Sequence, residues 1–529
     1  MVDTKKEQER EELHRAIWAI ADDLRGAVDG WDFKSYVLGT MFYRYISENI
    51  ASYINQGEID AGNPDFRYED MSDAEAEQAR EGLVQEKGFF ILPSELFCNV
   101  RAKAASDENL NETLETVFRH IEESAKGSSS EGQFAGLFDD YDVNSNKLGA
   151  TVAKRNEKLV KLLNGVADMN LGDVKEHDID AFGDAYEYLM TMYASGAGKS
   201  GGEFFTPSCV VRTLVEVLQP FKGRVYDPCC GSGGMFVQSA KFVENHSGNI
   251  NDISIYGQDS NPTTWKLAQM NLAIRGIEPD LGKYAADTFL DDQHPTMRAD
   301  YIMANPPFNL SNWGAEQLKD DVRWQYGMPP ASNANFAWLQ HMIYHLAPGG
   351  RMGMVLANGS LSSQSSGEGD IRKNIVNADL VDCIIAMPTQ LFYTTQIPVS
   401  LWFISKRKKQ AGKTLFIDAR KMGVMVSRKL RELADEDIKK IADTYNAYVS
   451  GTLEDVKGFC AVVDTEKIAE QDYILTPGRY VGVEEQEDDG ESFEEKMARL
   501  TSELSDLFKQ SHKLEAEIKE KLGAIGYEI

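Results

Sequence analysis

The chain has 529 residues, of which 42% are hydrophobic and 10% aromatic, so it has ample material for packed cores and is not disordered throughout. At about 150 residues for an ordinary domain, this length predicts three or four domains. The 55 basic and 84 acidic side chains give a net charge of −29. An acidic surface repels phosphate, which disfavours a protein that grips DNA through its own charge.

The six cysteines include no CxxC pair, so the sequence suggests neither a disulfide scaffold nor a zinc site, and we expect no bound metal. The N-terminal segment is charged and lacks the apolar run of a signal peptide. No stretch is long enough to span a bilayer. We therefore expect a soluble, cytoplasmic chain without a membrane partner.

Residues 1–170 predict a helical N-terminal domain. Apolar residues recur every three or four positions, as on one face of a helix, at Leu13, Ile17, Ile20 and Leu24. Gly30 is expected to break this helix, and a second apolar face follows at Phe33, Val37, Met41 and Tyr45. An aromatic cluster predicts core packing, with ligand binding as the alternative; its members are Trp31, Phe33, Tyr36, Phe42, Tyr43 and Tyr45.

Residues 171–410 predict a different domain, in which short β-rich runs alternate with helical stretches. Between 201 and 410 there are 17 basic and 19 acidic side chains, a net of −2, so the flanking regions carry −27. The expected strands span 224–227, 253–257, 301–304, 352–356, 381–385 and 399–404. Apolar strands separated by helices are typical of a mostly parallel, doubly wound α/β sheet, which binds its ligand at the carboxyl ends of the strands.

The C-terminal part is expected to consist of a connector at 411–483, which completes the preceding α/β domain, and an assembly segment at 484–529. The acidic run at 484–492 indicates a solvated linker. The following residues keep a coiled-coil spacing through Phe493, Met497, Leu500, Leu504, Leu507, Ser511, Leu514 and Ile518. This apolar stripe either folds back on its own chain or packs on a helix of a partner.

The segment Asp227-Pro-Cys-Cys-Gly-Ser-Gly-Gly234 follows the first expected strand and precedes an apolar helix. Glycines at such a turn let the backbone approach a ligand closely, and the helix N-terminus favours an anionic group. The segment lacks the GK[ST] of a Walker loop, and its spacing does not match the dinucleotide fingerprint GxGxxG. A tight strand-to-helix turn without a ligand is the alternative.

Two carboxylates follow the next segments of the chain. Asp259, at the end of the second expected strand, is placed to accept hydrogen bonds from both hydroxyls of a ribose, unless it only caps a helix. Asp287 is placed to accept from an exocyclic amino group such as that of adenine, unless it is an ordinary surface carboxylate.

The sharpest signal is Asn305-Pro-Pro-Phe308, directly after the strand 301–304. Two prolines fix the backbone and remove two donors, so the carbonyl between them and the Asn305 side-chain oxygen face outward as acceptors. Two acceptors that hold the hydrogens of an amino group leave its nitrogen lone pair free for attack. Phe308 offers an apolar face on which a planar group can stack. The motif therefore indicates chemistry on a planar amine.

Taken together, DPCCGSGG, a following acidic residue and NPPF resemble the S-adenosylmethionine-dependent methyltransferases that act on amino groups of adenine or cytosine in DNA. The segment AGKSGGEFFTP at 197–207 resembles the additional cofactor motif of one subgroup. With the helical N-terminus and the C-terminal heptads, nearly the whole chain is similar to the modification subunit of type I restriction-modification systems. The resemblance implies a Rossmann-like methyltransferase fold.

The resemblance also implies a role for each motif residue. S-adenosyl-L-methionine would be held by Glu203, Phe205, Thr206, Pro207, Asp227, Gly231, Ser232, Gly233, Asp259 and Asp287. The target base would be held by the catalytic residues Asn305, Pro306, Pro307 and Phe308. Because a base within a duplex is out of reach, it must first be flipped out of the helix. Phe392 and Tyr393, in the loop after Pro388, would line its pocket, with core packing as the alternative.

The resemblance implies transfer of a methyl group to the N6 amino group of adenine in a specific sequence of double-stranded DNA. Cytosine N4 methylation, methylation of a protein glutamine and a non-catalytic assembly role remain open. The expected partners are a specificity subunit, bound by two modification subunits, and a restriction subunit; the N-terminal domain would contact DNA or a partner. The net charge supports a separate reader of DNA, since only the basic run 406–409 is a local candidate for phosphate contact.

Overall fold

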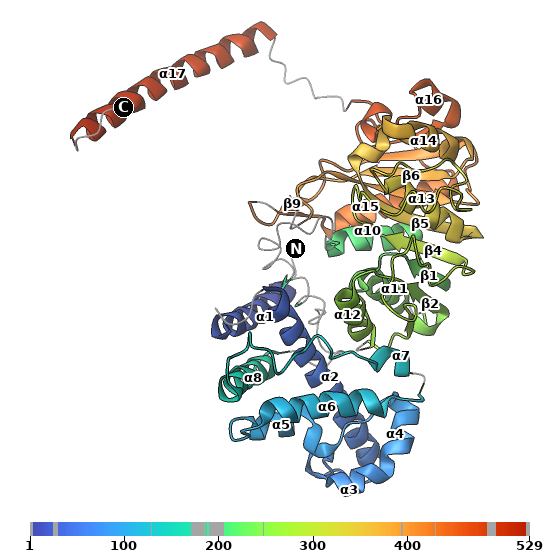
Figure 1. The fold of residues 1–529 in the computed structure, drawn as a ribbon. Helices are drawn as coiled ribbons and strands as arrows, with labels where there is room; N and C mark the ends of the chain where they lie inside the picture. The colour runs from blue at the N-terminus through green and yellow to red at the C-terminus, as the bar shows by residue number, and fades with distance from the viewer. Residues whose placement is uncertain are drawn as a thin grey trace. The chain divides into compact units, whose positions relative to one another are not determined.

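The computed structural model describes residues 4–24, 30–128, 130–170, 185, 188–189, 206–246, 248–273, 275–392, 395–428, 430–483 and 493–524 (Figure 1). The chain forms two compact units, Met1–Val481 and Gly482–Ile529. Glu203, Phe205 and Tyr393 lie outside the described residues. Within the described part of the chain, no helix combines the length and the apolar character needed to cross a membrane.

The N-terminal region is helical, as predicted. Its helices are α1 (Thr4–Asp23), α2 (Gly30–Asp60), α3 (Asp73–Ala76), α4 (Arg80–Lys87), α5 (Phe97–Ala104), α6 (Leu110–Ser124), α7 (Glu131–Phe134) and α8 (Val152–Ala167). Gly30 starts α2. The four apolar residues expected on one face of the first helix are all buried. The aromatic cluster is core: Phe33, Tyr36, Phe42 and Tyr43 are buried and Tyr45 packs against them; the side chain of Trp31 is outside the described part.

The second region of the first unit is built on a nine-stranded sheet with the order β11-β8-β6-β7-β5-β4-β1-β2-β3. The strands are β1 (Gly223–Asp227), β2 (Ile253–Gly257), β3 (Pro279–Asp280), β4 (Ala299–Ala304), β5 (Leu346–Ala357), β6 (Val381–Ala386), β7 (Val399–Ser405), β8 (Lys413–Asp418) and β11 (Cys460–Asp464). All six expected strands are present. β8 and β11 belong to the 411–483 segment, so that segment completes the same sheet.

The sheet is mostly parallel, as expected, but β7 and β11 run against their neighbours. β7 lies between β5 and β6 and is antiparallel to both. β11 is antiparallel to β8 at the edge of the sheet. Every residue of β6 and β7 is buried, because helices cover both faces of the sheet at this point.

Helices cover both faces of this sheet. One core contains side chains from α10 (Ser208–Leu218), α11 (Gly234–Asn245), α12 (Pro262–Ala273) and α15 (Asp435–Ser450). The other contains side chains from α13 (Asn335–His345), α14 (Glu368–Asn377) and α16 (Thr465–Glu470). Neighbouring residues of β1 alternate between the two cores: Val225 lies in the first and Tyr226 in the second. This is the expected doubly wound arrangement.

Helix α12 also contacts the N-terminal helical region. Trp265 and Leu272 pack in the core of the sheet, whereas Leu267 and Met270 belong to the core of the helical region. Lys266 Nζ lies 3.1 Å from an Asp139 carboxylate oxygen. The helical region therefore packs on a helix that follows the second strand of the sheet.

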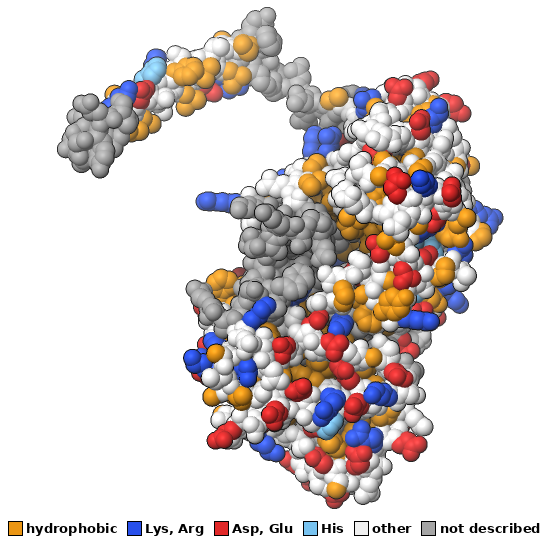
Figure 2. All heavy atoms as spheres, in the orientation of Figure 1, with side chains coloured by type: hydrophobic (Ala, Val, Ile, Leu, Met, Phe, Trp, Pro, Cys, Tyr) orange, Lys and Arg blue, Asp and Glu red, His pale blue; other side chains and the backbone are white. Residues whose placement is uncertain are grey.

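The second unit contains the helix α17 (Phe493–Ala524). The described apolar residues of its predicted stripe are exposed, from Met497 at 44% to Leu507 at 59%. They run along the helix in Figure 2.

Candidate active site

The motifs predicted to carry chemistry meet at one edge of the sheet, where β4, β1 and β2 end. Asp227 is the last residue of β1, Asp259 follows β2 by two residues, and Asn305 directly follows β4. β1 lies between β2 and β4, and the three strands are parallel. The connections from β1 therefore begin at a point where the strand order reverses, which is where doubly wound sheets bind their ligands.

The glycine turn after β1 takes a conformation that glycine adopts most readily. Gly231 and Gly233 have φ of 55° and 80°, in the left-handed region. Gly233 is the N-cap of α11, and no side chain caps that helix. A Cβ at Gly231 would meet no atom within 4 Å. The turn thus leaves open space beside the backbone N–H groups of a helix N-terminus.

Asp259 braces this turn. One carboxylate oxygen accepts a hydrogen bond of 3.0 Å from the backbone N–H of Gly231, and the other accepts from Asn261 at 2.9 Å. The residue that caps α12 is Asn261, whose side chain accepts from the Thr264 N–H at 3.1 Å. The alternative that Asp259 is a helix cap is therefore wrong, and its carboxylate lies at the glycine turn.

Asp227 is buried, with 2% of its surface exposed. Its carboxylate accepts from the backbone N–H of Cys229 at 3.0 Å. Burial raises the pKa of Asp227 to about 7, and the nearby Asp259 carboxylate adds to the rise, while the hydrogen bonds from Cys229 oppose it. Near neutral pH this carboxyl group is therefore about half protonated.

Asp287 lies in a loop that is tied to the other two motifs. Gln258, fully buried beside Asp259, donates to the carbonyls of Ala286 and Asp291. The Thr288 hydroxyl donates to the Pro228 carbonyl in the glycine turn. The Asp287 side chain is exposed, and one of its oxygens accepts from two backbone N–H groups of its own loop. No sequence motif had indicated Gln258 or Thr288 as positioning residues.

Asn305 is held by the segment that precedes α10. Its amide nitrogen Nδ2 donates a hydrogen bond of 2.9 Å to Thr206 Oγ1. The nitrogen of the amide is thereby directed toward Thr206, and the acceptor oxygen lies on the opposite edge of the group. The structure thus brings together the predicted cofactor segment 206–207 and the predicted catalytic tetrapeptide.

The other residues of the tetrapeptide are largely buried. Pro306 is buried, Pro307 is half-buried, and Phe308 is 7% exposed. The Phe308 ring packs edge to face on Phe392, with ring centroids 6.0 Å apart. Phe392 itself is 3% exposed, so core packing accounts for it, at a position in contact with the tetrapeptide.

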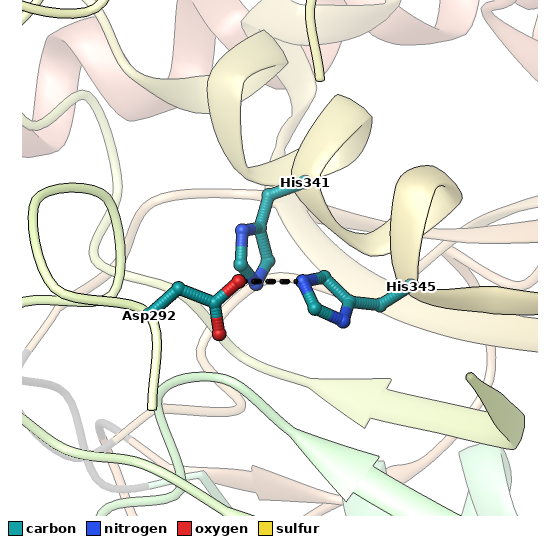
Figure 3. A group of neighbouring side chains, drawn as sticks. All are labelled: Asp292, His341 and His345. Atoms are coloured by element: carbon teal, nitrogen blue, oxygen red, sulfur yellow. Dashed lines mark hydrogen bonds and ion pairs between the residues drawn. The ribbon is translucent and has the colours of Figure 1, made fainter. Parts of the chain in front are cut away.

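A buried polar network beside Tyr226 of β1 contains Asp292 and two histidines one turn apart on α13, His341 and His345 (Figure 3). Their ligand-type atoms all lie within 4.8 Å of one another. This spacing would suit a metal ion, but the ring nitrogens that would bind it are already engaged in hydrogen bonds. Arg323 Nη1 lies 3.1 Å from His341 Nδ1. Arginine only donates, so Nδ1 accepts and the ring proton is on Nε2, 3.1 Å from the Tyr226 hydroxyl.

The second ring is likewise engaged on both sides. His345 Nδ1 faces the Met297 carbonyl at 3.2 Å, and Nε2 faces Asp292 at 2.9 Å. Burial opposes ionisation of Asp292, but the hydrogen bond from His345, the charges of His341 and His345 and the backbone N–H of His294 together outweigh it and lower the pKa of Asp292 to about 2. Burial and its cationic neighbours lower the pKa of His341 well below its usual range. These groups form a hydrogen-bond network, and we assign them no metal.

Two of the four residues of the basic run 406–409 are engaged within the protein. Lys406 donates to the Leu346 carbonyl at 2.7 Å, and Lys408 pairs with Asp379 at 2.6 Å. The side chain of Lys408 is only 2% exposed. Lys406 and Lys408 are therefore engaged within the protein where β7 ends, while Arg407 and Lys409 are exposed.

Comparison with known protein families identifies the family to which the chain belongs. The family model of the N-6 DNA methylases matches residues 177–489, more than half of the chain. The chain belongs to the N-6 DNA methylase family. The model of the HsdM N-terminal domain matches residues 13–166, the helical region.

Individual relatives of this N-6 DNA methylase agree. The type I restriction enzyme HindI methylase subunit of Haemophilus influenzae is 55% identical over 350 residues, 66% of this chain and 79% of the relative. The MjaIX methylase subunit of Methanocaldococcus jannaschii is 37% identical and covers 98% of this chain and 92% of its own. The crystal structure of a type I methyltransferase subunit from Streptococcus thermophilus has a TM-score of 0.77 at 29% identity, covering 90% of this chain and all of that one.

This methylase is accordingly an adenine-specific DNA methyltransferase, the modification subunit of a type I restriction-modification system. Membership decides between the alternatives that the motifs left open. The chain modifies adenine at N6 and is an enzyme, so methylation of cytosine N4 or of protein glutamine and a purely structural role are set aside.

Proposed function

We propose that this subunit binds S-adenosyl-L-methionine at the carboxyl edge of β1 and β2. The residues at this edge fit the cofactor. Open space at Gly231 and the uncapped N-terminus of α11 offer backbone donors to its carboxylate. Asp227 and Asp259 offer acceptors to its positive charge and its ribose hydroxyls. When bound, the cofactor supplies the methyl group. Ser232 and Gly233 line the methionine end, and Asp287 lies at the adenine end.

The Asn305–Thr206 hydrogen bond carries the proposed mechanism. With Nδ2 engaged by Thr206, the Asn305 oxygen and the Pro306 carbonyl accept the two hydrogens of the adenine amino group. This arrangement directs the nitrogen lone pair toward the methyl donor. The bound cofactor would supply the methyl group by cleavage of its sulfonium S–C bond and would be left as the thioether; the amino nitrogen would lose one proton to solvent, and Pro307 and Phe308 would fix the plane of the base. Glu203 and Phe205 belong to the proposed cofactor set through their motif alone.

We also propose how the chain is divided among tasks. Residues 1–170 contact DNA or a partner, 171–410 together with 411–483 form the catalytic region, and 484–529 serve assembly. The partners are a specificity subunit shared by two modification subunits, a restriction subunit, and duplex DNA with its target adenine flipped out. The acidic net charge of −29 supports a separate chain that reads the DNA.

The test compares the chain alone with the chain co-expressed with its gene neighbours. Each sample receives labelled S-adenosyl-L-methionine and unmethylated DNA, and the DNA is digested to nucleosides. N6-methyladenine is expected only with the partner. The Asn305→Ala variant is expected to abolish transfer and to bind the cofactor nearly as the wild type does. An unchanged rate in that variant would contradict the amino-group clamp.

A further inference from the structure

A small two-stranded ribbon stands apart from the nine-stranded sheet. It consists of β9 (Val424–Met425) and β10 (Arg431–Glu432), paired antiparallel with Met425 opposite Arg431. Val424, Met425 and Val426 are 59%, 45% and 50% exposed. In Figure 1 the ribbon extends outward from the helices and strands of the sheet domain. Three consecutive exposed apolar side chains on a projecting ribbon mark a contact surface.

The ribbon and the residues that flank it are locally basic within an acidic chain. Between 419 and 432 the sequence contains five basic residues and one acidic residue, against a net charge of −29 for the whole chain. Arg420 is paired with Asp418, and the side chains of Lys421 and Arg428 are exposed. This charge favours a polyanion as the occupant of the surface.

The base of the ribbon is fixed to the rest of the domain. An Asp437 carboxylate oxygen accepts from the N–H groups of Gly423 and Ala434, at 3.1 and 3.0 Å. The Arg431 guanidinium donates to the Met422 carbonyl at 3.0 Å. Gly423 has φ of 81°, and a Cβ there would meet the Glu432 carbonyl oxygen at 2.6 Å. The ribbon is therefore held in a defined position and not as a loose loop.

This position lies next to the proposed base pocket. The backbone N–H of Arg431 donates to the Gln390 carbonyl at 2.8 Å. Two residues further along that loop, Phe392 packs on Phe308 of the catalytic tetrapeptide. One hydrogen bond and one ring contact thus connect the ribbon to the residues proposed to hold the flipped adenine.

We propose that the β9–β10 ribbon binds the DNA duplex beside the target adenine. Lys421 and Arg428 contact phosphates, and Val424, Met425 and Val426 occupy the space in the base stack that the flipped adenine leaves. Apolar side chains that enter base steps offset part of the cost of unstacking. The inference rests on the proposed function, because it takes its DNA substrate and flipped base from there.

The experiment uses the methylase co-purified with its specificity subunit and a duplex containing its methylated site, mapped in the DNA of the expressing cells. A second duplex places the target adenine opposite an abasic site, so that the base is already unpaired. The triple variant Val424→Ser, Met425→Ser, Val426→Ser is expected to lose about tenfold in kcat/KM on the paired duplex and to approach the wild-type rate on the unpaired one. Arg428→Ala is expected to weaken binding to both duplexes and to lower the salt slope by about one.

Val456→Ser and Lys439→Ala are matched controls, since both residues are exposed and lie outside the ribbon. Unchanged cofactor binding and Tm show that the variants are folded. Wild-type rates in the triple variant on the paired duplex, or an equal loss on both duplexes, would overturn the proposed insertion. Loss of the specificity subunit on purification would assign the ribbon to a protein partner instead. No transfer by the wild-type complex on either duplex would contradict the proposed function itself.

Discussion

At the residue scale, Thr206 and Asn305 show how a hydrogen bond sets the direction of an amide. Replacing Thr206 by valine removes the oxygen that accepts from Asn305 Nδ2, while the shape of the side chain is kept. The amide then loses its fixed orientation, and kcat is expected to fall about tenfold, with cofactor affinity changed much less. Thr206→Ser restores the hydroxyl and is expected to restore kcat. Steady-state kinetics with both variants measure the difference, and a serine variant as slow as the valine variant would exclude this role.

Asp227 predicts a pH dependence of cofactor binding. Its pKa of about 7 means that much of the carboxyl is protonated near pH 6, whereas a cationic ligand beside it favours the ionised form. Binding of S-adenosyl-L-methionine is therefore expected to release up to one proton near pH 6 and to tighten between about pH 6 and 8. Calorimetry in buffers of different ionisation enthalpy measures the proton. Asp227→Asn should remove the pH dependence, and its persistence would assign the proton to another group.

The same pKa affects stability without a ligand. The folded-state pKa lies above the ordinary value of about 3.9, so this carboxyl favours the folded state most at pH values below that ordinary value. Its contribution declines as pH rises toward 7, because ionisation then occurs more readily in the unfolded chain. The Tm difference between wild type and Asp227→Asn should therefore be smallest at low pH and increase toward neutrality. A difference that does not vary with pH would contradict the raised pKa.

At the scale of elements, the loop that carries Asp287 depends on a residue outside every motif. Arg323 pairs with Asp321 and donates to the carbonyls of Thr288 and Phe289. A lysine cannot supply this fork of donors. Arg323→Lys is therefore expected to weaken S-adenosyl-L-methionine binding about tenfold and to speed hydrogen exchange in the loop. Arg80→Lys, in the helical region, is the control; unchanged exchange in the loop would show that Arg323 does not position it.

At the scale of the whole molecule, the second unit is expected to act in assembly alone. The apolar side chains of α17 are exposed along the helix, and such a stripe is stabilised by packing on a partner helix. Truncation after residue 490 should leave cofactor affinity unchanged and prevent co-purification of the specificity subunit. Leu504→Asp with Leu507→Asp should act like the truncation, whereas Glu503→Gln should not. Co-purification of the partner with the truncated chain would disprove this role.

Local patterns were sufficient for much of the fold. The alternation of apolar runs gave six strands, since buried strands need continuous apolar sequence, and the spacing of Leu13, Ile17 and Ile20 gave a buried helix face. Strand direction was not available in the same way. The apolar sequence of β7 resembles that of its neighbours, because all of these strands are buried on both faces. Its antiparallel direction depends on the end of the sheet at which the preceding connection enters the strand.

The sequence by itself determined the class of reaction, methyl transfer to an amino group. The glycine turn, the acidic residue and NPPF each follow a strand, and this places them at the binding edge of the sheet. Tertiary structure decided what holds them. Gln258, Thr288 and Arg323 act on residues roughly thirty to sixty positions away, and only the folded sheet edge brings those partners within hydrogen-bond distance. It also decided which basic residues are exposed: Lys408 of the run 406–409 pairs within the protein, whereas Arg428 between β9 and β10 is exposed. Charge and pattern are local properties, but exposure depends on packing.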